Sequence, residues 1–414
     1  MNDRGQPLSI LALSPFMPYP PDHGGRIRTF LLLRELARRG HRVELIALAE
    51  GEAEFARAEA LSAHGLTVRP VLHPRRFGSL TLGDRLRKAG NLLRGRSDVL
   101  ARFASTEAIR AARAPGQGAR DVVLAELLWT APLALFADAR LHVLDAHNVE
   151  TLIARRTAEE TAGILARAAA RLEARGMQRD EVRLVRRFEA VVVVSEADRR
   201  HLEALAPGIE CCVIGNCVDT EALTPLESGG HPAPVCLFVG SPNYPPNARA
   251  VESFSRDVFP RVRDRFPGAR FVAVGADPPP SLLRLVRECP GVEIAGYVDD
   301  VVDVYREATI VVVPITVAGG TRTKILEAMA LGRPVVSTTV GAEGLPVAPG
   351  EHVMIADEPG AFAAAIASLH ERPEQSRQMV AAGRRLVEAH GSARAAGAAL
   401  EALLLARLDR KAAR

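Results

Sequence analysis

Lysine is almost absent from this 414-residue sequence. The positively charged residues are nearly all arginine, and the only lysines are Lys88, Lys324 and Lys411. Together with the abundance of alanine, glycine and proline, this bias is typical of a GC-rich bacterial genome. The formal net charge of +4 is spread over the whole chain and does not predict nucleic-acid binding. Against this background, a lysine at position 324, inside a segment rich in glycine and threonine, is unusual.

Cysteines are few, and long apolar runs are missing. The five cysteines are odd in number and form no C-x-x-C pair, which argues against a disulfide framework and a zinc site. We therefore expect a protein of the reducing cytoplasm. No stretch approaches the roughly 20 apolar residues that a membrane-spanning helix requires. The first apolar run, residues 8–13, is too short for the core of a signal peptide and predicts a buried strand.

The length and the alternation of patterns predict two α/β domains. A chain of 414 residues exceeds what one hydrophobic core usually supports. Short apolar runs alternate with amphipathic helical stretches, which is typical of parallel sheets with crossover helices. The first set of predicted strands covers residues 8–13, 42–48, 67–71, 121–125, 141–145 and 190–194. The second set covers residues 235–239, 270–274, 292–294, 309–313, 334–337 and 352–355.

A connector rich in turn residues, 225–232, lies between the two sets. We expect one domain over residues 1–208 and a second over 209–387, with a C-terminal helix, 388–414, that packs back on the first domain. The pair Cys211-Cys212 is predicted to be buried strand. The first helix is predicted from Arg26 to Arg39, because Gly40 supplies a helix stop.

The dinucleotide-binding fingerprint G-x-G-x-x-G is missing after the first strand of each set. Its absence argues against a dehydrogenase. Ligands of open parallel sheets bind at the carboxyl ends of the strands, so functional residues are expected directly after the predicted strands.

The most informative segment, Gly319-Gly320-Thr321-Arg322-Thr323-Lys324-Ile325-Leu326-Glu327, follows the predicted strand 309–313. Glycines let backbone N–H groups approach a ligand closely, and Thr321 or Thr323 can cap a helix that begins here. The start of a helix with Lys324 in its first turn suits a phosphate group. Glu327 lies on the same helical face and can accept hydrogen bonds from a ribose diol. The same spacing also fits an ordinary surface ion pair, so the residues alone leave both interpretations open.

This segment and several others resemble glycosyltransferase family 4, the retaining GT-B glycosyltransferases of group 1. The matching segments follow the family's order along nearly the whole chain. They are Pro20-Pro21-Asp22-His23-Gly24-Gly25, Asp145-Ala146-His147-Asn148-Val149-Glu150, Val191-Val192-Val193-Val194-Ser195-Glu196, Val213-Ile214-Gly215-Asn216-Cys217-Val218-Asp219, Phe238-Val239-Gly240-Ser241 with Asn247, and Gly296-Tyr297-Val298-Asp299.

The resemblance implies a fold of the α/β class: two Rossmann-like domains whose parallel sheets face each other across a central cleft. It assigns the acceptor side to the first domain and the nucleotide sugar to the second. It also implies that catalysis needs no metal and no other cofactor, and that the nucleotide sugar is a substrate.

In the second domain the resemblance supplies donor-binding residues. Glu327 matches the second carboxylate of the family's E-x7-E motif, which binds the donor ribose. Tyr297 matches the residue whose backbone meets the nucleotide base. The first carboxylate of the motif would fall at Gly319, so backbone N–H groups of Gly319, Gly320 and Thr321 are expected to replace it.

A second departure from the family concerns positive charge. The resemblance places Gly240 and Ser241 among the donor-binding residues, but the usual Arg/Lys pair that binds the diphosphate is missing after them, where Asn243 and Asn247 stand instead. Lys324 and Arg322 are the candidates for the missing charge.

In the first domain the candidates are Gly24, Gly25 and His147. The two glycines lie between a strand and a helix, where backbone N–H groups can meet a diphosphate or an acceptor, although such a pair also makes an ordinary tight turn. His147 follows the predicted strand 141–145. A single histidine at such a place is often a structural hydrogen-bonding residue, but the resemblance puts an active-site histidine there. We therefore predict His147, Lys324 and Glu327 as the catalytic residues.

Two further features have simpler interpretations beside the functional ones. Asp299-Asp300 resembles a metal-binding pair, but it precedes a helical stretch and is better explained as a helix N-cap. The basic segment 75–102 is either a solvated helix face or a dock for anionic lipid headgroups or a lipid-diphosphate acceptor. We expect a cytoplasmic protein, with this segment as the candidate for peripheral contact with the inner face of the cytoplasmic membrane.

The sequence thus predicts a retaining glycosyltransferase that moves a sugar from a nucleotide-diphosphate donor to a glycan, lipid-linked or small-molecule acceptor in bacterial cell-surface polysaccharide biosynthesis. Lys324 and the glycine N–H groups would stabilise the charge that develops on the β-phosphate. Two alternatives stay open, a GT-B nucleotide-sugar epimerase and a non-catalytic pseudo-glycosyltransferase. The missing carboxylate at Gly319 favours the latter, whereas Lys324 and Glu327 argue against an inactive site.

Overall fold

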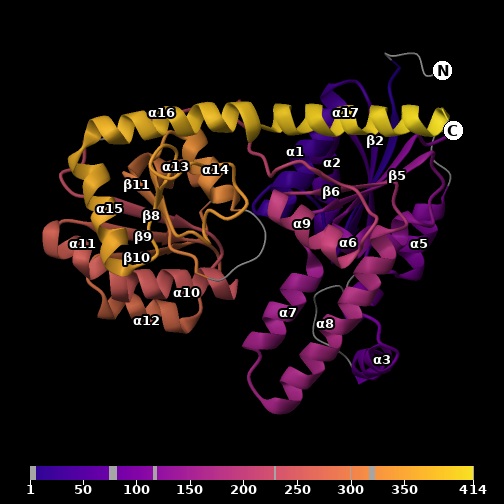
Figure 1. Ribbon diagram of the computed structural model, residues 1–414, viewed down its shortest axis with the longest axis horizontal. Helices are drawn as coiled ribbons and strands as arrows, with labels where there is room; N and C mark the ends of the chain where they lie inside the picture. The colour runs from indigo at the N-terminus through magenta and orange to yellow at the C-terminus, as the bar shows by residue number, and fades with distance from the viewer. Residues whose placement is uncertain are drawn as a thin grey trace. The chain divides into compact units, whose positions relative to one another are not determined.

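The computed structural model describes residues 6–73, 82–114, 119–227, 230–298, 300–316 and 322–413. The chain forms two compact units, Met1–Gly215 with Ala396–Arg414, and Asn216–Ala395. Each unit contains one parallel β-sheet with helices packed on it (Figure 1). The predicted α/β class with two Rossmann-like domains is confirmed.

The first unit contains a seven-stranded sheet with the strand order β3-β2-β1-β4-β5-β6-β7. Its strands are almost entirely buried, because helices cover both faces of a parallel sheet. The strands are β1 (Ser9–Ser14), β2 (Arg42–Ala49), β3 (Leu66–Leu72), β4 (Val122–Glu126), β5 (Leu141–Ala146), β6 (Ala190–Val193) and β7 (Cys211–Val213).

The helices of the first unit are α1 (Gly24–Arg38), the short 3-10 helix η1 (Glu52–Glu54), α2 (Ala56–Ser62), α3 (Leu82–Leu93), α4 (Asp98–Phe103), α5 (Thr106–Arg113), α6 (Leu127–Ala134), α7 (Glu150–Glu160), α8 (Ile164–Val185) and α9 (Glu196–Leu205). Helix α1 begins at Gly24 rather than at the predicted Arg26 and has Arg39 as its C-cap residue. The predicted stop at Gly40 is confirmed, since its φ of +89° suits glycine after a helix. Helices α7 and α8 pack side by side as a hairpin, with α3 beside it (Figure 1).

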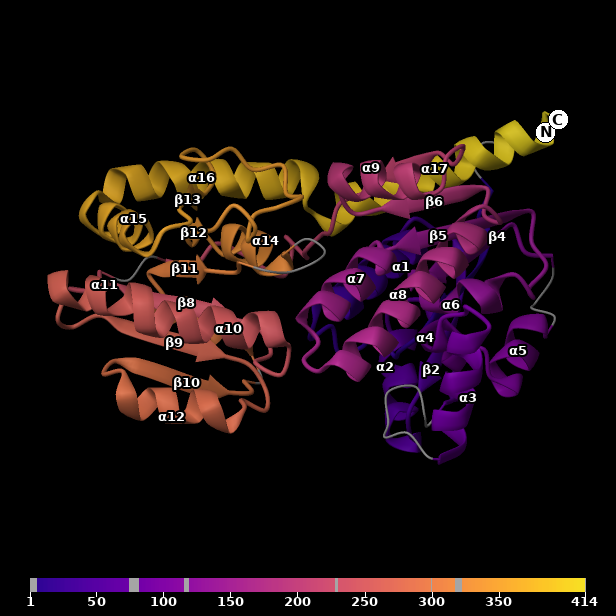
Figure 2. The ribbon, with the colours of Figure 1, turned by 60° about the horizontal axis from the view of Figure 1, so that its bottom comes forward.

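The second unit contains a six-stranded sheet with the order β10-β9-β8-β11-β12-β13. Figure 2 shows these strands in this order, from β10 at one edge of the sheet to β13 at the other. Its strands are β8 (Val235–Val239), β9 (Arg270–Val274), β10 (Val292–Gly296), β11 (Ile310–Val313), β12 (Val335–Ser337) and β13 (Met354–Ile355). Its helices are α10 (Pro245–Ser253), the π-helical turn η2 (Phe254–Val258), α11 (Phe259–Arg265), α12 (Pro280–Glu288), α13 (Val301–Glu307), α14 (Thr323–Ala330), α15 (Pro359–Glu371) and α16 (Pro373–His390).

The boundary between the units differs from the predicted residue 208. Strand β7 pairs in parallel with β6, with Cys211 opposite Val191, so the Cys211-Cys212 pair belongs to the first sheet. The first unit therefore extends to Gly215. Because β7 has only three residues and is exposed at one end, its short apolar pattern did not show which sheet it would join.

The C-terminal boundary also differs from the predicted 388–414. Helix α16 belongs to the second unit and ends at His390, and the last helix, α17 (Ala393–Ala412), begins after a break at Gly391-Ser392. From Ala396 onward this helix belongs to the first unit. There Glu401 accepts hydrogen bonds from Arg39 at 2.9 Å and from the ring of His41 at 3.0 Å.

The turn-rich connector lies within the second unit, where a buried arginine holds it in place. The guanidinium of Arg333 donates to the carbonyl oxygens of Leu226, Glu227 and Tyr305 at 2.8–3.2 Å. A cavity of about 690 Å³ opens beside it, at the amino ends of β11 and β12. Parallel sheets bind ligands at the opposite, carboxyl ends.

None of the helices in the described parts of the chain is both long enough and apolar enough to cross a membrane.

Candidate active site

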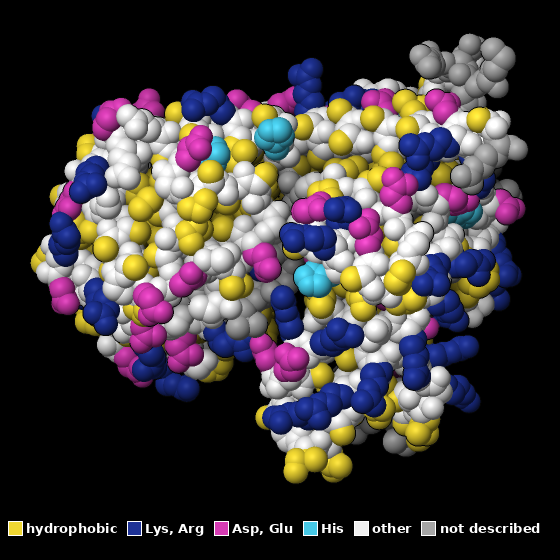
Figure 3. Space-filling model, in the orientation of Figure 1, with side chains coloured by type: hydrophobic (Ala, Val, Ile, Leu, Met, Phe, Trp, Pro, Cys, Tyr) yellow, Lys and Arg dark blue, Asp and Glu magenta, His cyan; other side chains and the backbone are white. Residues whose placement is uncertain are grey.

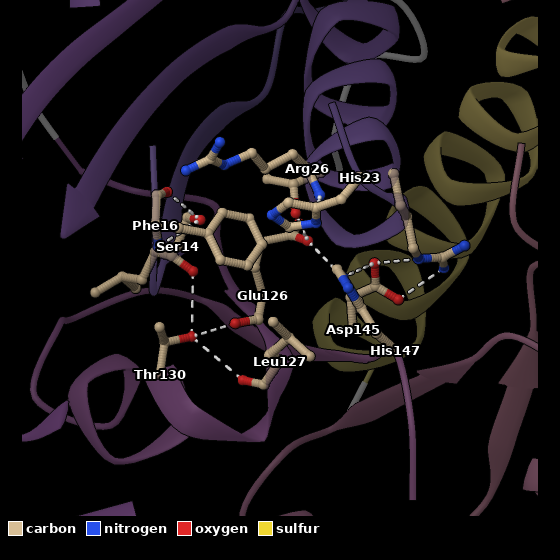
Figure 4. A network of polar contacts seen from close by, with 12 residues as sticks. Ser14, Phe16, His23, Arg26, Glu126, Leu127, Thr130, Asp145 and His147 are labelled. Atoms are coloured by element: carbon tan, nitrogen blue, oxygen red, sulfur yellow. Dashed lines mark hydrogen bonds and ion pairs between the residues drawn. The ribbon is translucent and has the colours of Figure 1, made fainter. Parts of the chain in front are cut away.

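In the first unit a chain of buried polar side chains lies at the carboxyl ends of two central strands (Figure 4). Strand β4 ends with Glu126, and β5 contains Asp145 and is followed closely by His147. Helix α1 adds Arg28 and Thr29. All five side chains are buried, which is unusual for charged residues unless they are paired.

These side chains form one connected network. The Nε2 atom of His147 lies 3.0 Å from Glu126 Oε2 and 3.4 Å from Asp145 Oδ2. The guanidinium of Arg28 donates to both oxygens of Asp145, at 2.8 and 2.7 Å. The hydroxyl of Thr29 donates to Glu126 Oε2 at 2.9 Å. Because both neighbours of His147 Nε2 are acceptors, this nitrogen carries a proton.

The network keeps His147 charged at neutral pH. Burial opposes the charged imidazole, but the hydrogen bond and charge of Asp145, followed by those of Glu126, outweigh it and raise the pKa of His147 to about 8. Burial also acts to raise the pKa of Asp145, but Arg28 outweighs it and holds this pKa well below its usual range. For Glu126, burial dominates and raises the pKa.

Two atoms of the network have no hydrogen-bond partner among the described residues. They are Nδ1 of His147 and Oε1 of Glu126, and both are buried. Buried polar atoms are nearly always satisfied, so unsatisfied ones often mark a binding or catalytic site. A protonated Nδ1 is a hydrogen-bond donor suited to an oxygen acceptor such as a sugar hydroxyl.

The backbone at the end of β4 is held in an unusual conformation. Leu127, directly after Glu126, has φ of +65°, a region that side chains other than glycine rarely adopt. The hydroxyl of Thr130 lies 2.8 Å from the carbonyl oxygen of Glu126 and 3.1 Å from that of Leu13, so it ties the bend to β1 (Figure 4). Backbone strain of this kind clusters at functional sites.

Glu126, Asp145 and His147 also place three potential metal-binding atoms within 4.8 Å of one another. Both oxygens of Asp145, however, already accept hydrogen bonds from Arg28. The guanidinium thus occupies the position where a cation would bind this carboxylate. The donor set suits a hydrogen-bonded network better than a resident metal ion.

The predicted glycines of the first unit lie at the start of the helix that supplies Arg28 and Thr29. Gly24 is the first residue of α1, and the ring of His23 accepts a hydrogen bond from the backbone of Arg26 at 3.4 Å as the helix N-cap. A Cβ atom at Gly25 would lie 3.3 Å from the ring of Phe16. Gly25 is therefore packed closely against Phe16, and Gly24 forms the N-terminus of α1.

Two further buried carboxylates, Glu150 and Glu181, lie near the chain segment that follows His147. Glu181 of α8 accepts hydrogen bonds from the backbone N–H groups of Glu150 and Thr151, both at 2.9 Å, and so caps α7. Burial, with the charge of Glu181, raises the pKa of Glu150 to about 7. These contacts fix the segment that follows His147.

In the second unit the predicted Gly240, Ser241 and Lys324 come together after β8 and at the start of α14. The Nζ atom of Lys324 lies 3.2 Å from Asn247 Oδ1 and 4.0 Å from the ring centroid of Phe238. The amide of Asn247 donates to the carbonyl oxygen of Ser241 at 2.9 Å. A Cβ atom at Gly240 would lie 2.7 Å from Lys324 Nζ and 2.9 Å from Asn247 Nδ2, so any larger residue would force these side chains to move.

Lys324 and Glu327 do not pair with each other. Neither has an ion-pair partner within 4.0 Å among the described residues, so the surface ion pair that the sequence left open is wrong. Burial and the charge of Arg322 lower the pKa of Lys324 to about 7, against the opposing effect of Glu327. Burial raises the pKa of Glu327, while Lys324 and a hydrogen bond from Tyr305 act in the other direction.

The remaining predicted donor-binding residues have different outcomes. Tyr297 directly follows β10, at the carboxyl edge of the sheet, and is 64% exposed. Arg322 is buried and is the N-cap residue of α14, without a capping side-chain hydrogen bond. The predicted cap at Thr323 is wrong, because Thr323 is already the first helical residue. Gly319, Gly320 and Thr321 lie outside the described residues.

The capping role predicted for the acidic pair is confirmed at Asp300, which accepts a hydrogen bond from the backbone of Val302 at 2.8 Å. Asp299 lies outside the described residues.

Glu126 was missed by the sequence reasoning. It belongs to no motif, and its strand was predicted to end one residue earlier. The available signal was a lone carboxylate that ends an otherwise apolar segment, Val122-Val123-Leu124-Ala125. A carboxylate at the carboxyl end of a buried parallel strand lies where ligands bind.

Two family models match the chain, one in each half. Residues 23–222 match the model described as "Glycosyltransferase Family 4", and residues 233–372 match the model described as "Glycosyl transferases group 1". No curated protein matches the chain in sequence.

Several solved structures share the fold over almost the full length. Sucrose-phosphate synthase from Thermosynechococcus elongatus is 16% identical with a TM-score of 0.72, over 97% of this chain and 100% of that one. Anabaena HepE in complex with UDP-glucose is 15% identical with a TM-score of 0.65, over 95% and 99%. A mutant of TarM from S. aureus, in complex with fondaparinux, alpha-GlcNAc-glycerol and UDP, is 9% identical with a TM-score of 0.66, over 96% and 100%. At these identities the likeness concerns the fold.

Proposed function

The chain belongs to the group 1 glycosyltransferases of family 4, and from this premise we propose that it is a retaining enzyme that uses a nucleotide-diphosphate sugar as donor. The main support for this proposal is the environment of the Lys324 side chain. This lysine has no carboxylate partner among the described residues and lies at the start of a helix beside a glycine that cannot be replaced without a clash. A cation and helix N–H groups at this sheet edge suit a diphosphate.

The rest of the donor is assigned to neighbouring residues. Glu327 is on the same helix as Lys324 and accepts hydrogen bonds from the ribose hydroxyls, and the backbone at Tyr297 contacts the base. Gly240 and Ser241 bring backbone groups to the diphosphate. Gly319, Gly320 and Thr321 supply the N–H groups that stand in for the family's first carboxylate. Proteins of similar fold have been solved with UDP or UDP-glucose bound, which supports a nucleotide sugar here.

In the proposed reaction the bond between the anomeric carbon and the β-phosphate oxygen breaks as the acceptor hydroxyl attacks from the same face. The acceptor proton passes to the departing phosphate oxygen. Negative charge therefore grows on the phosphate, where Lys324 and backbone N–H groups stabilise it. No metal ion is required in this scheme.

We assign His147 to the transferred sugar. Its Nε2 is held by Glu126 and Asp145, so the protonated Nδ1 is left to donate to a sugar or acceptor oxygen. Arg28 keeps Asp145 ionised, and the strained bend at Leu127 fixes Glu126. Gly24 and Gly25, at the start of α1, offer N–H groups to the acceptor or the diphosphate.

The acceptor is proposed to be a glycan, a lipid-linked sugar or a small molecule in the biosynthesis of a bacterial surface polysaccharide. The reaction belongs in the cytoplasm, where nucleotide sugars are used. The basic segment 75–102 is proposed to contact the inner face of the membrane. Of this segment the structure describes residues 82–102, and on α3, within this range, Leu86 and Leu93 are exposed next to basic residues.

The test is a thermal-shift screen against nucleotide diphosphates and their sugars, followed by analysis of the products with and without acceptor. The proposal predicts stabilisation by one nucleotide diphosphate and sugar transfer with retained anomeric configuration. Release of an epimerised sugar, or binding without any turnover of the donor, would contradict it and support an epimerase or a non-catalytic partner protein.

A further inference from the structure

The end of the α7–α8 hairpin exposes large apolar side chains to solvent. The turn at Ala162-Gly163 is followed by Ile164 and Leu165, the first two residues of α8, and these are 88% and 86% exposed. Figure 3 shows hydrophobic side chains gathered at this end of the hairpin and Lys and Arg side chains next to them. Other contacts hold the two helices together, such as the hydrogen bonds from the backbone of Glu150 and Thr151 to Glu181 and from Arg155 to Gln178.

The acidic residues of α8 face neighbouring elements of the first unit and accept hydrogen bonds from them. Glu173 accepts hydrogen bonds from the hydroxyl of Ser97 at 2.6 Å and from the backbone of Asp98 at 3.1 Å, at the start of α4. Asp180 accepts one from the backbone of Ser97 at 2.8 Å, and Glu181 caps α7. The negative charges of this helix therefore contact helix N-termini rather than solvent.

The arginines of α8 point outward instead. Arg167, Arg171, Arg175 and Arg179 recur every four residues and are all exposed. Among the described residues none of the four forms an ion pair with a carboxylate. Because residues four apart lie on one helical face, they form a positively charged stripe that leads from the apolar end toward the sheet. The acidic residues on the outside near this end are Glu159 and Glu160 of α7.

Helix α3 extends the same surface. Arg179 lies directly over Gly95, at the end of α3. Leu86 and Leu93 of α3 are 68% and 88% exposed, and Arg87, Lys88 and Arg94 accompany them. Apolar side chains in front of a basic stripe are the pattern of an element that lies at a membrane surface.

We propose that the α7–α8 hairpin docks on an anionic membrane: Ile164 and Leu165 enter the interface between headgroups and acyl chains, and the arginine stripe of α8 binds the lipid phosphates. Each buried methylene group and each arginine near the negative surface adds to membrane affinity. Neither contribution is sufficient alone, because two side chains bury little area and charges are screened by salt. The docking does not depend on the sugar chemistry, so each can be tested while the other fails.

The test is co-sedimentation of the full chain with vesicles of phosphatidylcholine, with and without phosphatidylglycerol. We expect binding that requires the anionic lipid and weakens with salt. I164D/L165D should lower the partition coefficient onto the vesicles at least about tenfold, and R171E/R175E should lower it at least about fivefold per charge. All four side chains are exposed, so these variants keep the thermal stability of the parent protein.

Matched controls lie on α12 of the second unit, where Leu283 and Val286 are exposed beside Arg284 and Arg287. L283D/V286D and R284E/R287E should bind vesicles as the parent does. Insertion is read separately from L165W, whose fluorescence brominated lipids should quench, while L283W is unaffected. Binding to anionic vesicles that survives I164D/L165D, or vesicle binding lost only in the α12 variants, would overturn the proposal.

Discussion

Glu126 and His147 show how a buried histidine can keep its charge at neutral pH. Two carboxylates surround one ring nitrogen, and Arg28 ensures that at least one of them is ionised. The folded-state pKa of His147, about 8, lies above the ordinary value of 6.5. The protonated imidazole therefore stabilises the fold fully below pH 6.5, and this contribution is lost as the pH rises through about 8.

The first prediction concerns the support of His147 by Glu126. Glu126→Gln keeps the size and the hydrogen bond from Thr29 but removes a negative charge, so the pKa of His147 should fall toward its ordinary value. The fall can be followed by NMR titration of the histidine ring. The rate of transfer above pH 7 should decrease with it, by about tenfold or more. A His147 titration identical in the variant and the parent would contradict this role.

The second prediction concerns the pH dependence of donor binding. With a pKa near 7, Lys324 loses its proton as the pH rises through neutrality, and a bound diphosphate favours the protonated form. Affinity for a nucleotide diphosphate should therefore fall above pH 7, approaching about tenfold per pH unit. Calorimetry in buffers of different ionisation enthalpy should detect proton uptake on binding. Binding without proton uptake at pH 8 would show that Lys324 does not meet the diphosphate.

The third prediction concerns the close packing of Lys324 against Gly240. Gly240→Ala places a methyl carbon 2.7 Å from Lys324 Nζ and should displace the lysine. Nucleotide affinity should then fall about tenfold or more, since a hydrogen bond to a charged group is lost. Gly268→Ala is the control, because its added Cβ meets only an ordinary contact at 3.5 Å. Equal nucleotide affinities of the two variants would contradict the assignment.

At the scale of the elements, apolar runs predicted each strand that has a buried pattern of four residues or more. Strands such as β5 and β11 could be read from the sequence, because parallel strands covered on both faces consist of apolar residues. Strand β7 was assigned to the wrong domain, since three residues cannot show which sheet they extend. The cap expected at Thr321 or Thr323 was not found at Thr323: the N-cap residue of α14 is Arg322, because the start of a helix depends on backbone geometry rather than on the nearest threonine.

Candidate residues within motifs were predictable, and those outside motifs were not. The clustering of Gly240, Ser241 and Lys324 follows from strand ends at one edge of a sheet. Glu126 gave no such signal, because its role depends on two neighbours, Asp145 and His147, that come from another strand. Its importance became visible only through burial and through the unpaired atoms beside it.

The fourth prediction concerns the attachment of the α7–α8 hairpin. A Cβ atom at Gly176 would lie 2.7 Å from the backbone of Arg96, so α8 can pack here only through glycine. Gly176→Ala should lower the free energy of unfolding by about 1–3 kcal/mol. Gly360→Ala is the control, since its Cβ would meet nothing within 4 Å. Chemical denaturation measures both, and a Gly176→Ala variant as stable as the control would contradict the packing.

At the scale of the whole molecule, two units of the same architecture carry different chemistry. The first unit holds a charged histidine in a buried network, and the second holds a lysine and a carboxylate at a helix start. A family model matches each unit separately, so the transferase identity does not rest on one half of the chain. The chain length and the alternation of apolar runs with helical stretches predicted a two-domain α/β protein, and the ends of the strands located the candidate residues.

The most direct test of the account combines nucleotide binding with sugar transfer in three variants. Lys324→Ala and Glu327→Ala should weaken the binding of the nucleotide diphosphate about tenfold or more in calorimetry. His147→Ala should bind the nucleotide as the parent does and fold normally, yet transfer almost no sugar. Parent-like nucleotide binding by both Lys324→Ala and Glu327→Ala, or parent-like transfer by His147→Ala, would contradict the account.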